Sequence, residues 1–263
     1  MRNNKKSLFV LLIVLSVAMV TAMAALRGQN GVNSNANDQQ KANLADDKSQ
    51  FPIVDYSSSE PADPEKRAKR QAKGKKYNNK YAPPIDESSE TIFSSVDWDA
   101  NLPALPVAKS RAVIIGEVTD AQAHLSDDKT AVYSEFTIRV DEVLKNDSSN
   151  ALSPSGSVAV ERNGGRVRFP SGHTVVSFTN HQRMPRVGGR YVLFLTHSFP
   201  TGEINQQDFY ILTGYELRGG RVFPLDNTNP GHPITAYKEA AESSFLKDLN
   251  SAVANSSPMT QPN

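Results

Sequence analysis

The stretch AVYSEFTIRVDEVLKND, residues 131–147, is the most regular pattern in the sequence. Successive side chains of a β-strand point to opposite faces, so a half-buried strand carries apolar residues at every second position. One face of this stretch carries the apolar side chains Phe136, Ile138 and Val140. The other face carries the polar side chains Glu135, Thr137 and Arg139. The pattern predicts one long strand with one face in a core and the other mostly in water.

A strand of this length spans roughly 40 Å at about 3.3 Å per residue, and such strands coil in a small domain and close barrels. A preceding strand is predicted over residues 111–119, where Gly116 indicates a bulge or a sharp bend. Shorter strand patterns follow at residues 157–162, 166–169, 174–178, 190–196, 209–213, 215–218 and 221–224. The sequence therefore predicts a mainly β protein.

Glycine pairs separate two of these strand patterns from their successors. Asn163-Gly164-Gly165 lies between residues 157–162 and 166–169, and Gly219-Gly220 lies between the last two patterns. Residues that tolerate positive φ are typical of tight hairpin turns. Both positions are therefore predicted to be two-residue hairpins.

Some strands are apolar on both faces and need two covers. Residues 190–196 are the clearest case, because apolar side chains point both ways along the pattern RYVLFLT. One cover is the barrel interior, and the other is a helix predicted over residues 235–254 with Thr235 as its N-cap. The apolar stripe of this helix has i, i+4 spacing and consists of Tyr237, Ala241, Phe245, Leu249 and Val253.

Composition excludes several classes of protein. The chain has 263 residues, a formal net charge of +1 and no cysteine. A near-neutral charge argues against nucleic-acid binding over the whole surface, because phosphate binding needs a basic footprint. The absence of cysteine excludes disulfides, thiol nucleophiles and cysteine-based zinc sites. A cysteine-free exported chain fits a bacterial envelope better than a small disulfide-stabilised animal domain.

The N-terminus carries an export pattern. Arg2, Lys5 and Lys6 precede an uncharged apolar run at residues 8–26, and Ala22-Met23-Ala24 supplies a small-residue cleavage motif. Cleavage would fall before Ala25. The alternative is an uncleaved inner-membrane anchor, because a run of about 19 residues is close to the ~20 that span a bilayer. In both cases the body of the chain is expected to be exported, to the periplasm or beyond the cell.

The segment that follows, residues 27–106, is predicted to be a disordered linker. Its first part is polar and has no apolar period, so it cannot bury enough surface to order itself. A basic run comes next, consisting of Lys66, Arg67, Lys69, Arg70, Lys73, Lys75, Lys76 and Lys80. An acidic block then spans residues 86–99. The basic run is either a contact for anionic lipid, cell-wall polymer or nucleic acid, or a solvated linker balanced by the acidic block.

The motifs VIIGEVT, YSEFTIRVDEVLK and VGGRYVLFL, in this order within residues 107–225, resemble netrin-like (TIMP-like) domains and their bacterial relatives. The resemblance implies a five-stranded OB-type barrel with helices packed outside, in a secreted binding or accessory module. TIMP inhibitors act through an N-terminal cysteine. Because this chain has no cysteine, metalloprotease inhibition is not implied and no functional residue is carried over.

Motifs of catalysis, metal binding and cofactor binding are missing from the sequence. It contains no G-x-S-x-G, H-E-x-x-H, Walker or G-x-G-x-x-G motif. His173 and His181 would lie roughly 26 Å apart on one strand, too far for joint ligation. No catalytic residue, metal or cofactor is predicted. The best candidate for ligand binding is a set of arginines within residues 161–190, where Glu161 is the single acid: Arg162, Arg166, Arg168, Arg183, Arg186 and Arg190.

Together these patterns predict an organisation and a function. The predicted parts are an export segment (1–26), a linker (27–106), an OB-like β-barrel or curved sheet (107–226), a C-terminal helix packed on it (227–256) and a tail (257–263). The predicted function is non-catalytic binding of an anionic envelope polymer or another envelope protein, through a shallow arginine face. Membrane contact would come through an uncleaved N-terminal segment. The alternatives are a hydrolase, with a histidine and a carboxylate converging in a pocket, and a structural envelope component.

Overall fold

The fold is built on an antiparallel hairpin of two long strands, β3 (Ala112–Leu125) and β4 (Val132–Lys145). The computed structural model describes residues 50–55, 63–88, 91–94, 102–197, 208–226 and 231–256. The alternation predicted for β4 is confirmed: its core-facing side chains are Phe136, Ile138 and Val140. The pairing of β3 with β4 shifts register at Gly116, where a side chain would collide with the Arg139 carbonyl. The predicted bend at this glycine is therefore confirmed.

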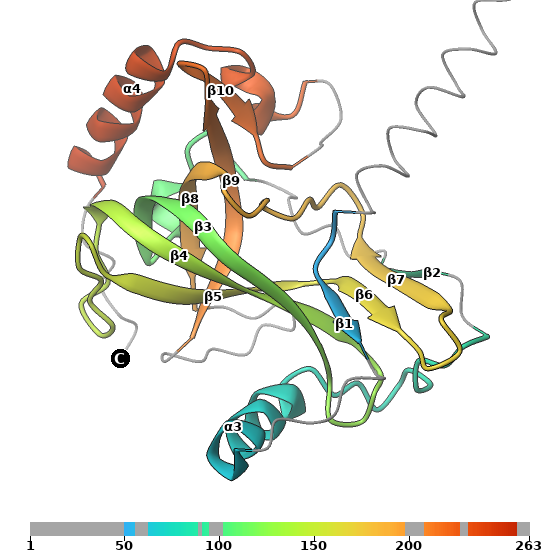
Figure 1. Ribbon diagram of the computed structural model, residues 1–263. Helices are drawn as coiled ribbons and strands as arrows, with labels where there is room; N and C mark the ends of the chain where they lie inside the picture. Colours follow the sequence, from blue (N-terminus) through green and yellow to red (C-terminus); the bar gives the residue numbers. More distant parts are fainter. Residues whose placement is uncertain are drawn as a thin grey trace, which may run out of the picture. The chain divides into compact units, whose positions relative to one another are not determined.

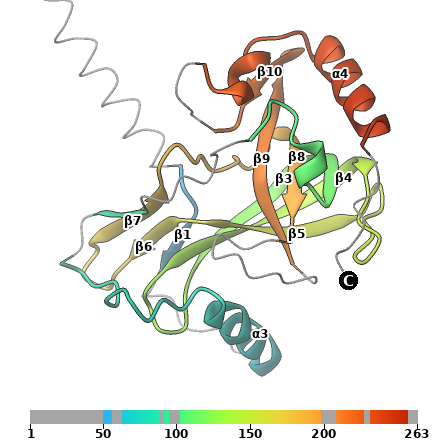
Figure 2. The same ribbon diagram turned by 180° about the vertical axis from the view of Figure 1, so that it is seen from behind.

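Three further strands close a ring with this hairpin. β5 (Ser157–Asn163) pairs with β4, and β8 (Arg190–Thr196) pairs with β3. β9 (Phe209–Arg218) pairs antiparallel with β8 and parallel with β5. The order β3-β4-β5-β9-β8, returning to β3, is that of a partly open, five-stranded OB-type barrel (Figures 1 and 2). The predicted barrel is confirmed.

Apolar side chains fill both sides of the ring wall on β3, β8 and β9. The interior contains Ile114, Phe136, Ile138, Val160, Leu193 and Phe209. A second core lies outside the wall and contains Val113, Ile115, Val192, Phe194, Tyr215 and Leu217. The helix α4 (Glu242–Ala254) covers this second core with Phe245 and Leu249. The two covers predicted for β8 are therefore present.

The C-terminal helix begins later than predicted. Residues Pro233–Tyr237 form a short 3-10 helix, and α4 begins at Glu242, so Thr235 is not its N-cap. The intervening chain pairs with β10 (Arg221–Pro224): the N–H of Glu239 donates to the Val222 carbonyl at 2.7 Å, and the Val222 N–H donates to Ala240. Backbone pairing to a sheet edge thus replaces the first turns of the predicted helix.

The two predicted hairpins differ in outcome. Gly219 and Gly220 have φ of 60° and 71° and join β9 to β10, as predicted. The prediction of a hairpin at residues 163–165 is wrong, because β5 and β6 (Gly165–Arg168) belong to different sheets. Gly164 has φ of 101°, and a side chain on it would lie 2.8 Å from the Ser177 carbonyl oxygen. The glycines here allow a close crossing from one sheet to the other.

The second sheet has the order β1-β6-β7-β2. Its outer strands β1 (Ile53–Asp55) and β2 (Thr91–Ser94) run parallel to β6 and to β7 (Thr174–Thr179), respectively. Val167 and Val175 of this sheet pack with residues near the tip of the β3–β4 hairpin. The described residues from Phe51 onward belong to one compact unit.

The prediction of a disordered linker over residues 27–106 is wrong for the part that the structure describes. This part contains β1, β2 and the helix α3 (Pro64–Lys75). Four of its apolar side chains are buried: Phe51, Tyr77, Ile85 and Leu102. They have no period because they pack at separate places: Phe51 joins the barrel core, Ile85 packs with Val167 and Val175 of the second sheet, and Tyr77 packs on Tyr133. The folded core therefore begins near residue 51 and not near residue 107.

The predicted export segment and the tail at residues 257–263 lie outside the described residues. Within the described ranges, no helix combines the length and the apolarity needed to cross a membrane.

Candidate functional site

The predicted arginine face is not assembled as one surface. Arg162 points into the molecule and is 1% exposed. Its guanidinium donates to both carboxylate oxygens of Asp226 at 2.8 Å and to the Arg183 carbonyl oxygen at 2.6 Å. Thr213 Oγ1 and the backbone N–H of Arg183 donate to the same carboxylate. Arg162 is therefore part of a buried structural ion pair, which removes it from the predicted ligand face.

Arg166 and Arg168 lie on β6, in the second sheet, and contact the N-terminal chain. Arg166 Nε donates to the Phe51 carbonyl oxygen at 2.9 Å, and Arg168 lies 4.0 Å from Asp55. Burial, followed by the charge of Arg168, lowers the pKa of Arg166. Both arginines hold β1 against the sheet. Burial also lowers the pKa of Arg183, which lies in the loop before β8.

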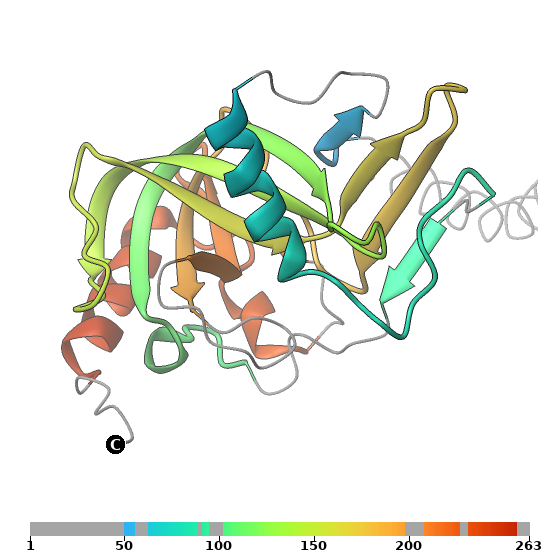
Figure 3. The same ribbon diagram turned by 90° about the horizontal axis from the view of Figure 1, so that it is seen from below.

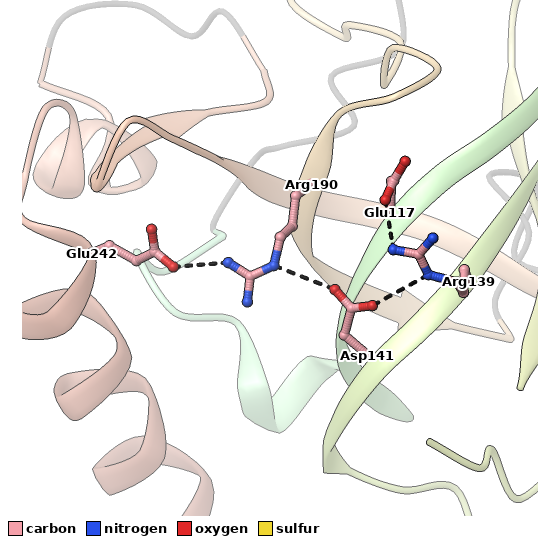
Figure 4. Close-up of polar contacts among 5 residues, drawn as sticks. All are labelled: Glu117, Arg139, Asp141, Arg190 and Glu242. Carbon is pink, nitrogen blue, oxygen red and sulfur yellow. Dashed lines mark hydrogen bonds and ion pairs between the residues drawn. The ribbon is translucent and has the colours of Figure 1, made fainter. Parts of the chain in front are cut away.

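Arg190 belongs to a chain of ion pairs on the outside of the barrel (Figure 4). Glu117 pairs with Arg139 at 2.6 Å, and Arg139 lies 3.6 Å from Asp141. Asp141 pairs with Arg190 at 3.3 Å, and Arg190 pairs with Glu242 of α4 at 2.9 Å. This series of ion pairs connects β3, β4, β8 and α4. Each of these exposed pairs contributes little to stability by itself.

Arg186, in the loop before β8, pairs with Glu216 of β9 at 2.5 Å. The hydrogen bond to Glu216 raises the pKa of Arg186. The six predicted arginines are thus divided between the barrel interior, the second sheet, the outer ion pairs and, for Arg183, the loop before β8. The structure does not bring them together as a shallow cationic surface.

One histidine and one carboxylate do converge, but in the interior. His197 is 2% exposed, and its Nε2 lies 3.3 Å from Asp147 Oδ2. Its Nδ1–H donates to the Asp208 carbonyl oxygen at 2.8 Å, and its ring stacks on Phe209. Burial lowers the pKa of His197 more than the charge of Asp147 raises it. Sequence reasoning missed this pair because its members lie on distant segments with no motif.

The surroundings of this pair do not form a catalytic triad. The hydroxyl of Ser149 donates to Asp147 and not to the imidazole. A catalytic triad needs the nucleophile on the imidazole, with the carboxylate behind it. His197 and Asp147 instead tie the loop after β4 to the end of β8.

A pocket of about 400 Å³ lies beside the start of the β5–β9 pairing. These strands pair at Val160 with Phe209 and at Glu161 with Tyr210, whereas β5 begins earlier, at Ser157. We call this cavity the seam pocket. Its apolar lining residues are Val140, Ala151, Leu152, Val158, Ala159 and Phe209. Its polar and charged lining residues are Lys73, Asn150, Ser153, Ser157 and Asp208.

The helix α3 lies across β4 and β5 (Figure 3). Its Lys73 lines the seam pocket. Lys73 pairs with Glu135 of β4 and lies 3.1 Å from Glu161 of β5. Lys76 pairs with Asp208. Burial opposes the charge of Lys73, but its bonds to the two glutamates outweigh burial and raise the pKa of Lys73.

Tyr77 follows α3 and anchors its C-terminal end. Its ring stacks on Tyr133 with centroids 3.9 Å apart, and its hydroxyl donates to Glu161 at 2.8 Å. Burial, followed by the charge of Glu161, raises the pKa of Tyr77 well above its ordinary value, so the phenol stays a donor. Glu161 points outward from β5 and is nevertheless 1% exposed, because α3 and Tyr77 cover it.

The local sequence explains why a helix forms here. Pro64 occupies the first helical position, and the preceding Asp63 accepts from the Glu65 N–H at 2.9 Å. Lys73 and Lys75 lie in the last turn, where positive charge favours the helix dipole. Gly74 allows α3 to approach the loop between β3 and β4, since a side chain would lie 3.1 Å from the Asp127 nitrogen.

Comparison with known proteins gives no family: no family model matches the chain, and no curated protein matches it in sequence. Within the described ranges, no group of three or more histidine and acidic side chains is placed to hold a metal ion. The function is therefore argued from the barrel, the seam pocket and the contacts of α3.

Proposed function

We propose that this chain is an exported, non-catalytic binding module of the cell envelope, whose ligand contacts the seam pocket. The observation that carries the proposal is the position of this pocket on an OB-type barrel. OB-type barrels bind their ligands over the face of the second and third strands and over the loops that follow the first and the fourth strands. The seam pocket lies at the third strand, β5, and its lining residue Asp208 ends the loop between the fourth and fifth strands, β8 and β9.

Export is supported by the N-terminal sequence and by the resemblance to netrin-like domains, which implies a secreted accessory role. The basic residues before an apolar run at residues 8–26 and the absence of cysteine both fit an envelope protein. A netrin-like relationship is part of the proposal.

Binding is favoured over hydrolysis by the chemistry of the pocket. Its charged lining residues are Lys73 and Asp208, and each already pairs with a residue of opposite charge. The histidine that converges with a carboxylate, His197, is buried, and its Nδ1–H is already donated to the Asp208 carbonyl oxygen. An accessible general base, which a hydrolase needs, is therefore not supplied by this pair.

The ligand is better matched by a polypeptide than by an anionic polymer. The predicted anionic-polymer site required a cationic face, and Arg162, Arg186 and Arg190 are instead neutralised by acids within the protein. Another envelope protein is therefore the partner class that we propose.

The absence of cysteine allows a direct test of the pocket. Ser157→Cys places one thiol at the pocket, and Ser244→Cys places one on the exposed side of α4 as the matched control. Each full-length variant would carry a short photoactivatable thiol reagent and be irradiated in envelope preparations of the producing cell. We expect the chain in the envelope fraction and a crosslinked product at position 157 only. A cytoplasmic chain, or equal crosslinking at the two positions, contradicts the proposal.

A further inference from the structure

We infer that the outer face of β4, β5 and β9 beneath α3 is a recognition site for lysine- and tyrosine-bearing segments of a partner protein, and that α3 is its built-in occupant. The inference rests on the proposed binding function and names the partner class. The face is defined by Tyr133, Glu135, Glu161, Asp208 and Tyr210, and we call it the acid–tyrosine face.

Two carboxylates on this face lie directly opposite each other. Glu135 and Glu161 are paired residues of neighbouring strands and both point outward. Like charges directly opposite on adjacent strands destabilise a sheet. The arrangement becomes favourable when a cation lies between them, as the ammonium group of Lys73 does. The face is therefore built around a cationic group that β4 and β5 do not themselves supply.

The remaining contacts extend this chemistry to a short pattern. Lys76 pairs with Asp208 at the start of β9, and Tyr77 stacks on Tyr133 while donating to Glu161. Lys73 lies in the last turn of α3, which ends at Lys75, and Lys76 and Tyr77 follow in the turn after it. That turn is held to the helix end, because the Lys76 N–H donates to the Lys73 carbonyl oxygen at 3.1 Å. A partner segment in which a helix end and the following turn carry the pattern K-x-x-K-Y presents the same groups to the face.

The helix α3 is suited to exchange with such a partner. Its sequence, PEKRAKRQAKGK, contains only alanines as apolar residues, so docking buries little apolar surface. Segments held by few apolar contacts open at low free-energy cost. Its like charges at i, i+3 and i+4 positions also disfavour the helix once it leaves the barrel. These features describe a weak internal occupant, held by charge and by Tyr77.

The test uses a full-length variant in which α3 no longer binds the acid–tyrosine face, called the vacated variant. The α3 sequence is then added as a separate peptide. In the variant K73E/K76E/Y77S, the end of α3 and the turn after it carry carboxylates toward Glu135, Glu161 and Asp208 and are repelled from them. The probe is the fluorescent peptide DPEKRAKRQAKGKKYNNKY, residues 63–81, and binding is read by anisotropy at low and high salt. If α3 is displaced in about a tenth or less of wild-type molecules, the wild type binds the peptide about tenfold or more weakly than the vacated variant.

Matched variants identify the site. K75E changes an exposed charge of α3 and should leave the face occupied, so it should behave as the wild type. Adding E135K and D208K to the vacated variant should abolish peptide binding. A peptide with glutamate at positions 73 and 76 should not bind. K73Q/K76Q, which removes the two charges without reversing them, provides a second vacated chain if the triple variant does not fold.

Three results would overturn the inference. They are a folded, vacated chain that does not bind the peptide, equal binding by wild type and vacated variant, and a wild-type dimer that forms through exchange of α3. The assay uses purified components and does not depend on export, whereas the crosslinking at position 157 is measured with Lys73 and Asp208 unchanged. Loss of peptide binding with retained crosslinking at position 157 would therefore contradict the inference and leave the proposed function standing.

Discussion

At the residue scale, the barrel interior depends on single side chains such as Phe136, which is fully buried. Phe136→Ala should lower the free energy of unfolding by about 3–5 kcal/mol, the usual cost of truncating a buried phenylalanine. Thr137→Ala, on the outer face of the same strand, is the matched control and should change it by about 0.5 kcal/mol or less. Urea unfolding of the mature chain measures both. Equal losses would mean that β4 is buried on both faces.

Arg162 and Asp226 form the buried ion pair that replaces one of the predicted surface contacts. Arg162→Met should cost about 3–5 kcal/mol of stability, because the Asp226 carboxylate stays buried without its cation. Arg162→Met combined with Asp226→Leu should recover part of this loss, since both charges are then removed. Denaturant unfolding of the single and double variants tests this coupling. A double variant as unstable as the sum of its parts argues against it.

Asp147 should make the stability of the protein sensitive to acid. Burial raises the pKa of Asp147, but hydrogen bonds from Ser149 and Asn150 and the nearby His197 outweigh burial and hold it below its ordinary value. A depressed carboxyl pKa gives stability that is present above the unfolded pKa of about 3.9 and is lost as the pH falls through the folded pKa. Asp147→Asn should therefore be less stable at neutral pH and should show a flatter pH dependence below about pH 4.

The pH dependence is measured by urea unfolding across the acid range. Asp127→Asn, at an exposed position, is the control and should keep the wild-type slope. His197 acts in the same direction: because burial lowers its pKa, stability falls as the pH drops below the unfolded value of about 6.5. An Asp147→Asn slope identical to that of the wild type would show that the carboxylate has no linked role.

At the element scale, the helix α3 turns a run of basic residues into a docked structure. Ion pairs of Lys73 and Lys76 hold it, and salt screens such pairs when they are partly exposed. Tryptic cleavage within residues 66–76 should therefore be slow at low salt and faster at high salt. Glu135→Gln combined with Asp208→Asn should be cut rapidly at both salt concentrations. A time course read by mass spectrometry decides this, and salt-independent cleavage of the wild type would contradict electrostatic docking.

The glycine turns show how much of an element can be predicted locally. Gly219 and Gly220 produce the hairpin that their sequence predicts, because β9 and β10 are neighbours in one sheet. The pattern at Asn163-Gly164-Gly165 is equally suggestive, yet β6 leaves the barrel and pairs with β1 and β7. Positive φ predicts a turn, but the partner of the next strand depends on contacts far along the chain.

At the scale of the whole molecule, the N-terminal sequence predicts export of the barrel. The uncharged run at residues 8–26 should export the chain. Mass spectrometry of the protein purified from its own cells should find a mature N-terminus at Ala25, or an intact Met1 in the membrane fraction if the segment is retained. A full-length protein in the cytoplasm would contradict both results.

The sequence by itself determined the local features of this protein. The alternation along β4, the bend at Gly116 and the apolar stripe through Phe245 and Leu249 follow from side-chain period and backbone preference alone. These features sufficed to predict a β-barrel with a helix packed against it. They depend on residues a few positions apart, whose geometry is fixed once the strand or helix forms.

The tertiary structure alone decided the role of the charges. Glu161 and Arg162 have the sequence pattern of solvent-exposed residues, but both are buried. Glu161 contacts Lys73 and accepts a hydrogen bond from Tyr77, and Arg162 forms an ion pair with Asp226. Such partners lie on separate segments, and each charge is buried only where its counter-charge arrives as well. The seam pocket and the docking of α3 have the same origin. The pocket and the docked helix form because the fold brings segments together that are far apart in the sequence. No local sequence pattern predicts such contacts.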